Sequence, residues 1–122
     1  MKSHKDLDVW KEAIELAKTV YLVTQDYPKE EMFGLVSQMR RAAVSIASNI
    51  AEGAARQGNK EFLQFLYIAI GSASELDTQI EISKTASMGD KEKLSEVQES
   101  VNRVARMIQG LIRSIKQKQD SS

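Results

Sequence analysis

A helical repeat of apolar residues, interrupted by only three turn signals, is the feature that most constrains the fold. Apolar side chains recur at steps of three and four residues over residues 7–26, 35–56, 60–85 and 91–118, the spacing of one face of an α-helix. Pro28 and the tetrapeptides RQGN and SMGD separate these stretches. The pattern therefore predicts four amphipathic helices joined by short connections.

Four such helices predict an all-α protein, an up-down-up-down antiparallel four-helix bundle in which residues 1–122 form a single domain. The composition favours helices, because Ala, Glu, Lys, Gln, Leu and Ile supply most of the sequence and there is one proline. A two-helix coiled coil with loose ends is the alternative. It fits less well, because three turn signals break the periodicity.

Residues at the ends of the helices carry predictions of their own. Asp6 is expected to cap the start of the first helix, and Pro28 is expected to end it. Gly58 is expected to close the second helix in a left-handed conformation, with Asn59 capping the third. Asp90 follows a glycine and is expected to cap the fourth helix.

Composition excludes several classes of protein. A chain of 122 residues can form one hydrophobic core without disulfides or metals. The lack of cysteine excludes disulfides, thiolate zinc sites and a cysteine nucleophile. The N-terminus MKSHKDLDVWKE lacks the apolar run of a signal peptide, and no apolar stretch reaches the roughly 20 residues that span a bilayer. We therefore expect a soluble, cytoplasmic protein with no membrane association.

The stretch SIASNIAEGAAR, residues 45–56, makes one helix almost free of bulky side chains. Glycine weakens a helix interior by about 0.5 to 1 kcal/mol relative to alanine. Gly53 is therefore expected to mark a contact where no Cβ fits, or the start of a looser last turn. A second patch of small residues begins at Gly71, and the closest backbone approach is expected between residues 71–74 and residues 41–48.

Two polar residues of this stretch have a structural interpretation. Asn49 borders the apolar face, so we expect it to be partly buried and hydrogen-bonded. Glu52 and Arg56 are four residues apart, which favours an ion pair along the helix. Contact of Asn49 and Glu52 with a ligand is the alternative.

Three runs of the sequence resemble a known family. They are LDVWKEAIELAKTVY, QMRRAAVSIASNIAEGAAR and KEFLQFLYIAIGSASELDTQ, and the combination of SNIAEG with GSASEL is the most specific part. Over about residues 7–115 the chain resembles the proteins encoded by intervening sequences in bacterial 23S rRNA genes. The resemblance implies a bundle with a left-handed twist that assembles as a ring-like homopentamer. It also implies similarity in fold to the accessory variability determinant of diversity-generating retroelements, which binds nucleic acid and partners a reverse transcriptase.

Apolar residues on more than one side of the second and third helices agree with such an assembly. The candidate interface residues are Val36, Val44, Leu63, Tyr67 and Ile70. The alternative is that they widen the core of a single copy, and the residues alone leave the two interpretations even. The resemblance favours an oligomer.

Binding to nucleic acid is the first functional hypothesis. Seventeen basic and seventeen acidic residues give no net charge, so only local patches can bind phosphates. Residues 100–119 contain five basic residues and no acidic one, and repetition around a ring would strengthen their effect. These candidates are Arg103, Arg106, Arg113, Lys116 and Lys118. A second, less coherent group comprises Arg40, Arg41, Arg56 and Lys60. Ordinary solvated helix faces are the alternative.

The second hypothesis is an oligomeric scaffold that binds a protein partner, with Glu75, Asp77 and Glu81 as an acidic surface. Catalysis is the weakest hypothesis, because the only histidine is His4, in an N-terminus expected to be flexible. The sequence has no phosphate-binding glycine loop and no HExxH motif, and its helical carboxylates lack the ExxH partners of a di-metal bundle. We therefore expect no catalytic residues, no cofactor and no metal.

Overall fold

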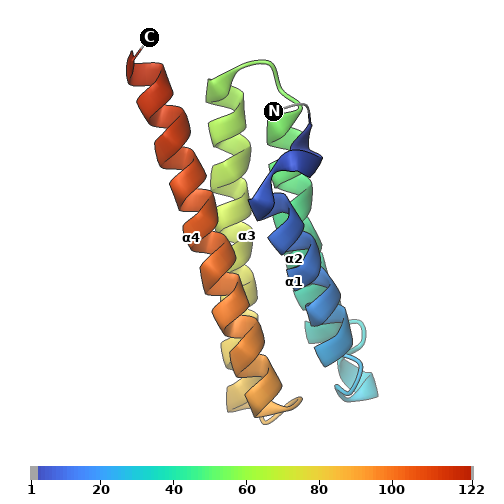
Figure 1. Ribbon diagram of the computed structural model, residues 1–122. Helices are drawn as coiled ribbons and strands as arrows, with labels where there is room; N and C mark the ends of the chain where they lie inside the picture. Colours follow the sequence, from blue (N-terminus) through green and yellow to red (C-terminus); the bar gives the residue numbers. More distant parts are fainter. Residues whose placement is uncertain (1–2, 122) are drawn as a thin grey trace.

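The predicted four-helix bundle is present in a computed structural model, which describes the backbone of residues 3–121 and the side chains of residues 3–118 (Figure 1). The chain is 84% helical and has no strand in the described part. Two short 3-10 turns accompany the four helices. In chain order the elements are η1 (His4–Asp6), α1 (Asp8–Val23), η2 (Lys29–Glu31), α2 (Leu35–Ala54), α3 (Asn59–Thr85) and α4 (Lys91–Ser121).

Helices that are neighbours in the chain run in opposite directions and lie side by side (Figure 1). Contacts join α1 to α2, α2 to α3, α3 to α4, and α4 back to α1. The α2–α3 link lies at the same end of the bundle as the last turns of α4, and the other two links lie at the opposite end (Figure 1). The prediction of an up-down-up-down bundle is therefore confirmed.

The core forms where the apolar faces of all four helices meet. In α4 the buried positions follow the predicted heptad spacing through Leu94, Val97, Val101, Val104 and Ile108. The largest fully buried side chains of α2 and α3 are Met39, Ile46, Ile50, Leu66, Leu76 and Ile80. Burial of this apolar surface supplies the main favourable term in folding.

Helix α1 ends five residues before Pro28, which corrects the predicted stop. Thr24 caps the helix, and its buried hydroxyl donates to the carbonyl of Val20 at 2.8 Å. Pro28 instead precedes η2 as its N-cap. Asp6 is not the cap of α1 either: it belongs to η1, where its carboxylate accepts a hydrogen bond from the backbone of Ser3 at 3.3 Å.

The predictions for the other two links have mixed outcomes. Gly58 has φ −110° and is extended, so the left-handed prediction is wrong; Asn59 is the first residue of α3, and no side chain caps that helix. Asp90 does cap α4, because its Oδ1 accepts from the backbone N–H of Glu92 at 3.0 Å. The left-handed glycine lies just before it, at Gly89 with φ +77°.

Candidate nucleic-acid interface and the α2–α3 groove

The C-terminal half of α4 presents a basic surface. Arg106, Arg113, Lys116 and Lys118 are all exposed. Within the described part of the chain no acidic side chain pairs with any of the four. Lys116 lies 5.5 Å from the centre of the Tyr67 ring, which connects this surface to α3.

Arg103 differs from the other predicted arginines of α4. Its Nη2 lies 2.7 Å from Oε2 of Glu12, so an ion pair joins α4 to α1. A guanidinium that already has a carboxylate partner offers less net charge to a phosphate. The free basic surface therefore begins one turn later than predicted, at Arg106.

The second predicted basic group is not a cluster. Arg40 binds the end of α1, with Nε donating to Thr24 Oγ1 at 3.1 Å and the guanidinium 4.6 Å from the Tyr21 ring centre. Arg41, on the same helix, lines a groove between α2 and α3. Arg56, at the other end of α2, is placed over Phe65. Arg40 is therefore a structural residue.

Arg56 lies between two carboxylates, because it pairs with Glu52 at 3.1 Å and approaches Glu61 at 3.9 Å. The predicted ion pair along the helix is confirmed, and it takes Arg56 out of the free basic surface. Lys60 is exposed and stands at the start of α3, at the end of the bundle where α4 finishes (Figure 1).

The seam between α2 and α3 is closed by small residues. A Cβ on Gly53 would lie 2.8 Å from Phe62 Cδ1 and 2.9 Å from Phe65 Cβ, so the predicted contact without room for a side chain is confirmed. Gly71 has nothing within 4 Å of such a Cβ, so it does not take part in a close approach. The sequence-based prediction is wrong for Gly71.

Hydroxyl and amide groups continue this seam. The hydroxyls of Ser45 and Ser72 lie 2.8 Å apart and share a hydrogen bond between the two helices. Asn49 Nδ2 donates to the carbonyl of Ser45 at 2.8 Å and to its hydroxyl at 3.0 Å. Asn49 is partly buried, and its predicted hydrogen bonding is confirmed.

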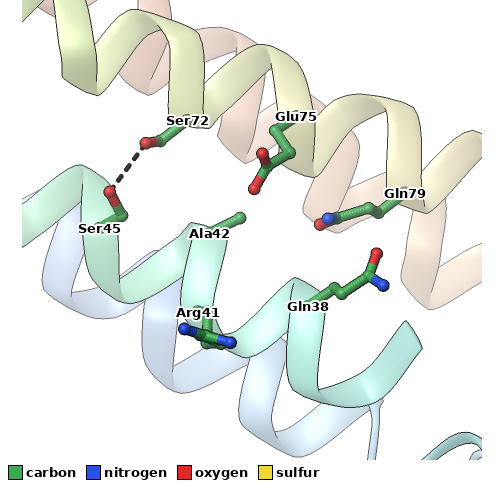
Figure 2. A pocket seen from close by; sticks show the side chains of 7 residues that line it. All are labelled: Gln38, Arg41, Ala42, Ser45, Ser72, Glu75 and Gln79. Atoms are coloured by element: carbon green, nitrogen blue, oxygen red, sulfur yellow. Dashed lines mark hydrogen bonds between the residues drawn. The ribbon is translucent and has the colours of Figure 1, made fainter. Parts of the chain in front are cut away.

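A polar groove of about 590 Å³ lies outside this seam (Figure 2). Its walls carry one cation, Arg41, and one anion, Glu75, and neither has an ion-pair partner among the described residues. The side chain of Gln79 is only 6% exposed, and its Oε1 accepts no hydrogen bond in the described structure. The complete lining is Gln38, Arg41, Ala42, Ser45, Ser72, Glu75 and Gln79.

The segments SNIAEG on α2 and GSASEL on α3 both lie along this seam, and they are the ones that carry the family resemblance. The model of the 23S rRNA-intervening sequence protein family matches residues 5–110. The chain belongs to this family. None of the curated proteins matches it.

A solved structure shows the same fold as this family member. It is a protein of unknown function from the S23 ribosomal protein family of Bacteroides thetaiotaomicron VPI-5482. The two chains are 21% identical and superpose with a TM-score of 0.74 over 85% of this chain and 97% of the other. At that identity the likeness establishes the fold alone.

The predicted interface residues of the family member lie in different environments. Val36 is 1% exposed and belongs to the core, which corrects its assignment to an intersubunit surface. Leu63 and Ile70 are partly buried against the core. Val44 and Tyr67 are exposed. Val44 borders a second, apolar groove of about 250 Å³ between α1 and α2.

Sequence reasoning missed seven exposed large apolar residues, among them Phe33, Ile68 and Ile82; the others are Ile14, Tyr21, Leu22 and Met32. Phe33 lies in the link before α2, and both isoleucines lie on α3. Helical spacing identified α3 as apolar on several sides but did not show which side faces outward. The signal that could have found the isoleucines is their separation by two heptads, with Gly71 and Glu75 between them on the same stripe.

The predicted acidic surface is divided. Asp77 and Glu81 both accept hydrogen bonds from Gln98 Nε2, at 3.0 and 2.8 Å, so they serve the α3–α4 contact. Lys84 Nζ donates to Gln98 Oε1 at 2.7 Å and completes this network. Glu75 faces the other way, into the α2–α3 groove. These three carboxylates therefore do not form one surface.

Chemistry-bearing groups are few in the described residues. His4 lies in η1, and its ring is edge-on to Trp10 with 5.0 Å between the ring centres. No three His, Cys, Asp or Glu side chains of the described chain are placed to hold a metal ion.

Burial raises the pKa of Tyr27, and the nearby Ser83 hydroxyl offsets part of that rise. No helix within the described range is long and apolar enough to cross a membrane.

Proposed function

We propose that this family member is a non-catalytic homo-oligomer that binds RNA or DNA phosphates through the C-terminal half of α4. The observation that carries the proposal is the run of exposed cations from Arg106 to Lys118, which has no acidic residue between its ends. Lysine and arginine bind phosphates by charge, without reading base sequence.

Assembly would compensate for the small number of cations per copy. Several copies that present the same surface raise the effective concentration of each for one nucleic acid. The homopentamer that the resemblance implies would bring five such surfaces together, each with Lys60 at the same end of the bundle. The zero net charge of the chain then limits nonspecific attraction elsewhere on the surface.

The experiment is a fluorescence-anisotropy titration of a structured 23S rRNA fragment and a matched DNA duplex at low and moderate salt. The test variant carries Arg106→Glu and Arg113→Glu. The control carries Lys91→Glu and Lys93→Glu, which changes the net charge equally at the other end of the same helix. Each lost phosphate contact lowers the slope of log affinity against log salt by about one.

The proposal expects salt-sensitive binding by the wild type and the control, and strongly reduced binding by the test variant. Equal loss of affinity in both variants would mean that net charge alone matters, and the assignment of binding to the C-terminal half of α4 would be wrong. No binding by the wild type at low salt would favour the second candidate, an oligomeric scaffold for a protein partner. The unpaired groups of the α2–α3 groove favour that candidate.

A further inference from the structure

Tyr67 is an aromatic side chain at the surface of α3, beside the cations of α4. Its side chain is 49% exposed, so a large part of the ring faces solvent. Lys116 Nζ lies 5.5 Å from the centre of the ring. The ring and the basic surface of α4 therefore form one continuous patch.

This patch carries no carboxylate. The residues one turn away from Tyr67 on its own helix are Leu63, Gln64, Ile70 and Gly71. Lys60 is exposed and lies one heptad earlier, on the same stripe of α3. On α4, Lys116 belongs to the run that has no acidic residue from Ser100 to Gln119. A half-exposed ring with only cations as charged neighbours is complementary to a polyanion that also has flat apolar groups.

A second tyrosine with a cation on its ring provides a contrast. Tyr21 is 44% exposed, and the Arg40 guanidinium lies 4.6 Å from the centre of its ring. Hydrogen bonds hold that guanidinium in place, to Thr24 Oγ1 at 3.1 Å and to the carbonyl of Tyr21 at 3.3 Å. Lys116 has no ion pair within the described part of the chain. Its ammonium sits on a flexible stem, so it can leave the ring for a phosphate.

From these observations we infer that Tyr67 stacks against an unpaired base of a single-stranded nucleic acid, while Lys116 and Arg113 bind the phosphates beside it. Every base has a flat π-face, so such stacking does not depend on sequence. It is also stronger than the exposed cation–π contact that it replaces. The inference rests on the proposed function and deepens it, because it names single strands and unpaired loops as the ligand.

The preference for a single strand follows from what each form of nucleic acid presents. In a duplex the bases are paired and stacked on one another, so a ring at the protein surface meets only phosphates and sugars. In a single strand the bases can turn outward and stack on an aromatic side chain. Phosphate contacts alone would bind both forms. A preference at equal charge is therefore the signature of the ring.

The first test titrates a labelled oligothymidine strand and a DNA duplex with the same number of phosphates, followed by fluorescence anisotropy. The wild type should bind the single strand more tightly. Tyr67→Ala should lower the affinity for the single strand by about tenfold and leave the affinity for the duplex unchanged. Tyr67→Phe keeps the ring and should keep the affinity.

The matched control is Tyr21→Ala. It removes an exposed ring beside a cation at the other end of the bundle, and it should bind both ligands like the wild type. Circular dichroism should show wild-type helix content in all three variants, because both tyrosines are half exposed. Equal loss of affinity in Tyr67→Ala and Tyr21→Ala would overturn the assignment to Tyr67.

The second test separates the ring from the charges through salt. Tyr67→Ala should lower the affinity for the single strand without changing the slope of log affinity against log salt, because the ring releases no counterion. Arg113→Gln should reduce that slope by about 0.7. A smaller slope in Tyr67→Ala would mean that the ring acts only by placing Lys116, and it would overturn stacking.

The third test looks for the contact itself. A strand that contains 5-iododeoxyuridine is irradiated in complex with the wild type, and the crosslinked peptide is identified by mass spectrometry. The crosslink should map to Tyr67. A crosslink that maps elsewhere would overturn the inference.

The outcomes separate this inference from the proposed function. Wild-type protein that binds neither ligand would overturn both. Equal affinity for single strand and duplex, with loss of both in the Arg106→Glu, Arg113→Glu variant, would overturn the stacking and leave the α4 surface intact. Sedimentation velocity tests the other use of Tyr67, as a residue between copies. A Tyr67→Ala variant that loses mass together with affinity would support that use and overturn stacking.

Discussion

The bundle closes its α2–α3 seam and its α1–α4 seam by different means. Small residues close the first, where Gly53 lies against Phe62 and two serine hydroxyls meet. Branched aliphatic side chains fill the core side of α4, and the Arg103–Glu12 ion pair closes its outer edge toward α1. A seam made of small residues brings the backbones close but leaves a polar groove outside it. The seam made of large residues is filled by their side chains, and the ion pair at its edge joins the two helices.

Because of this difference, we expect α4 to be sensitive to the loss of side-chain volume and the α2–α3 seam to its addition. The largest effect on stability is expected from removing bulk on α4. Ile108 is fully buried. Ile108→Ala should lower the free energy of unfolding by about 3 kcal/mol, because it loses apolar burial and leaves a cavity. Urea denaturation followed by circular dichroism measures this. The exposed neighbour substitution Gln109→Ala should stay within about 0.5 kcal/mol of the wild type.

Adding bulk should be the harmful change on the α2–α3 seam. Gly53→Ala places a methyl group within 3 Å of two phenylalanines, and the cost of overpacking exceeds the gain in helix propensity. We expect a net loss of about 1 to 2 kcal/mol in the same denaturation assay. Gly71→Ala is the matched control and should gain about 0.5 to 1 kcal/mol in the monomer. Equal effects at the two glycines would contradict the close contact at Gly53.

Tyr27 allows a test at the end of the bundle that holds the α1–α2 link and the α3–α4 link (Figure 1). Its hydroxyl is buried, its ring packs beside Gly89, and burial raises its pKa. The folded pKa then exceeds the unfolded value of about 10, so the stabilisation is full below pH 10. Above pH 10 the unfolded state ionises first, and stability falls.

Tyr27→Phe should therefore remove part of the stability loss between pH 9 and pH 11. At neutral pH its effect should be small, within about 1 kcal/mol, because the hydroxyl contributes little when buried with poor partners. Denaturation curves across this pH range provide the measurement. An unchanged alkaline slope would show that another group controls it.

The sequence predicts the helices well because their periodicity is local. The heptad of α4 lies in the core as expected, while α1 ends early at Val23, where the capping Thr24 accepts a hydrogen bond from Arg40, sixteen residues away. That contact depends on tertiary structure. The same reasoning succeeded at Gly53 and failed at Gly71, because a glycine in a helix interior does not by itself require a close contact, and nothing lies within 4 Å of a Cβ at Gly71.

The candidate surfaces were predicted less completely, for a related reason. Val36 and Ile68 are both apolar residues in helices with more than one apolar side, yet the first is buried and the second is half exposed. Each residue rotates the helix face by about 100°, so the packing of neighbouring helices decides which side faces outward. The ion pair of Arg103 with Glu12 was not foreseen because the two residues lie far apart in the sequence, so Arg103 was predicted to be free to bind phosphate.

The smallest predicted effect concerns this ion pair on the outer edge of the α1–α4 seam. Both side chains are partly exposed to solvent, so water and salt screen their attraction. Glu12→Gln should lower the free energy of unfolding by about 0.2 to 1 kcal/mol at low salt, and by less at high salt. It should also release Arg103 to join the basic surface, so nucleic-acid binding should strengthen while stability falls. Weaker binding by Glu12→Gln would place the phosphate surface away from this part of α4.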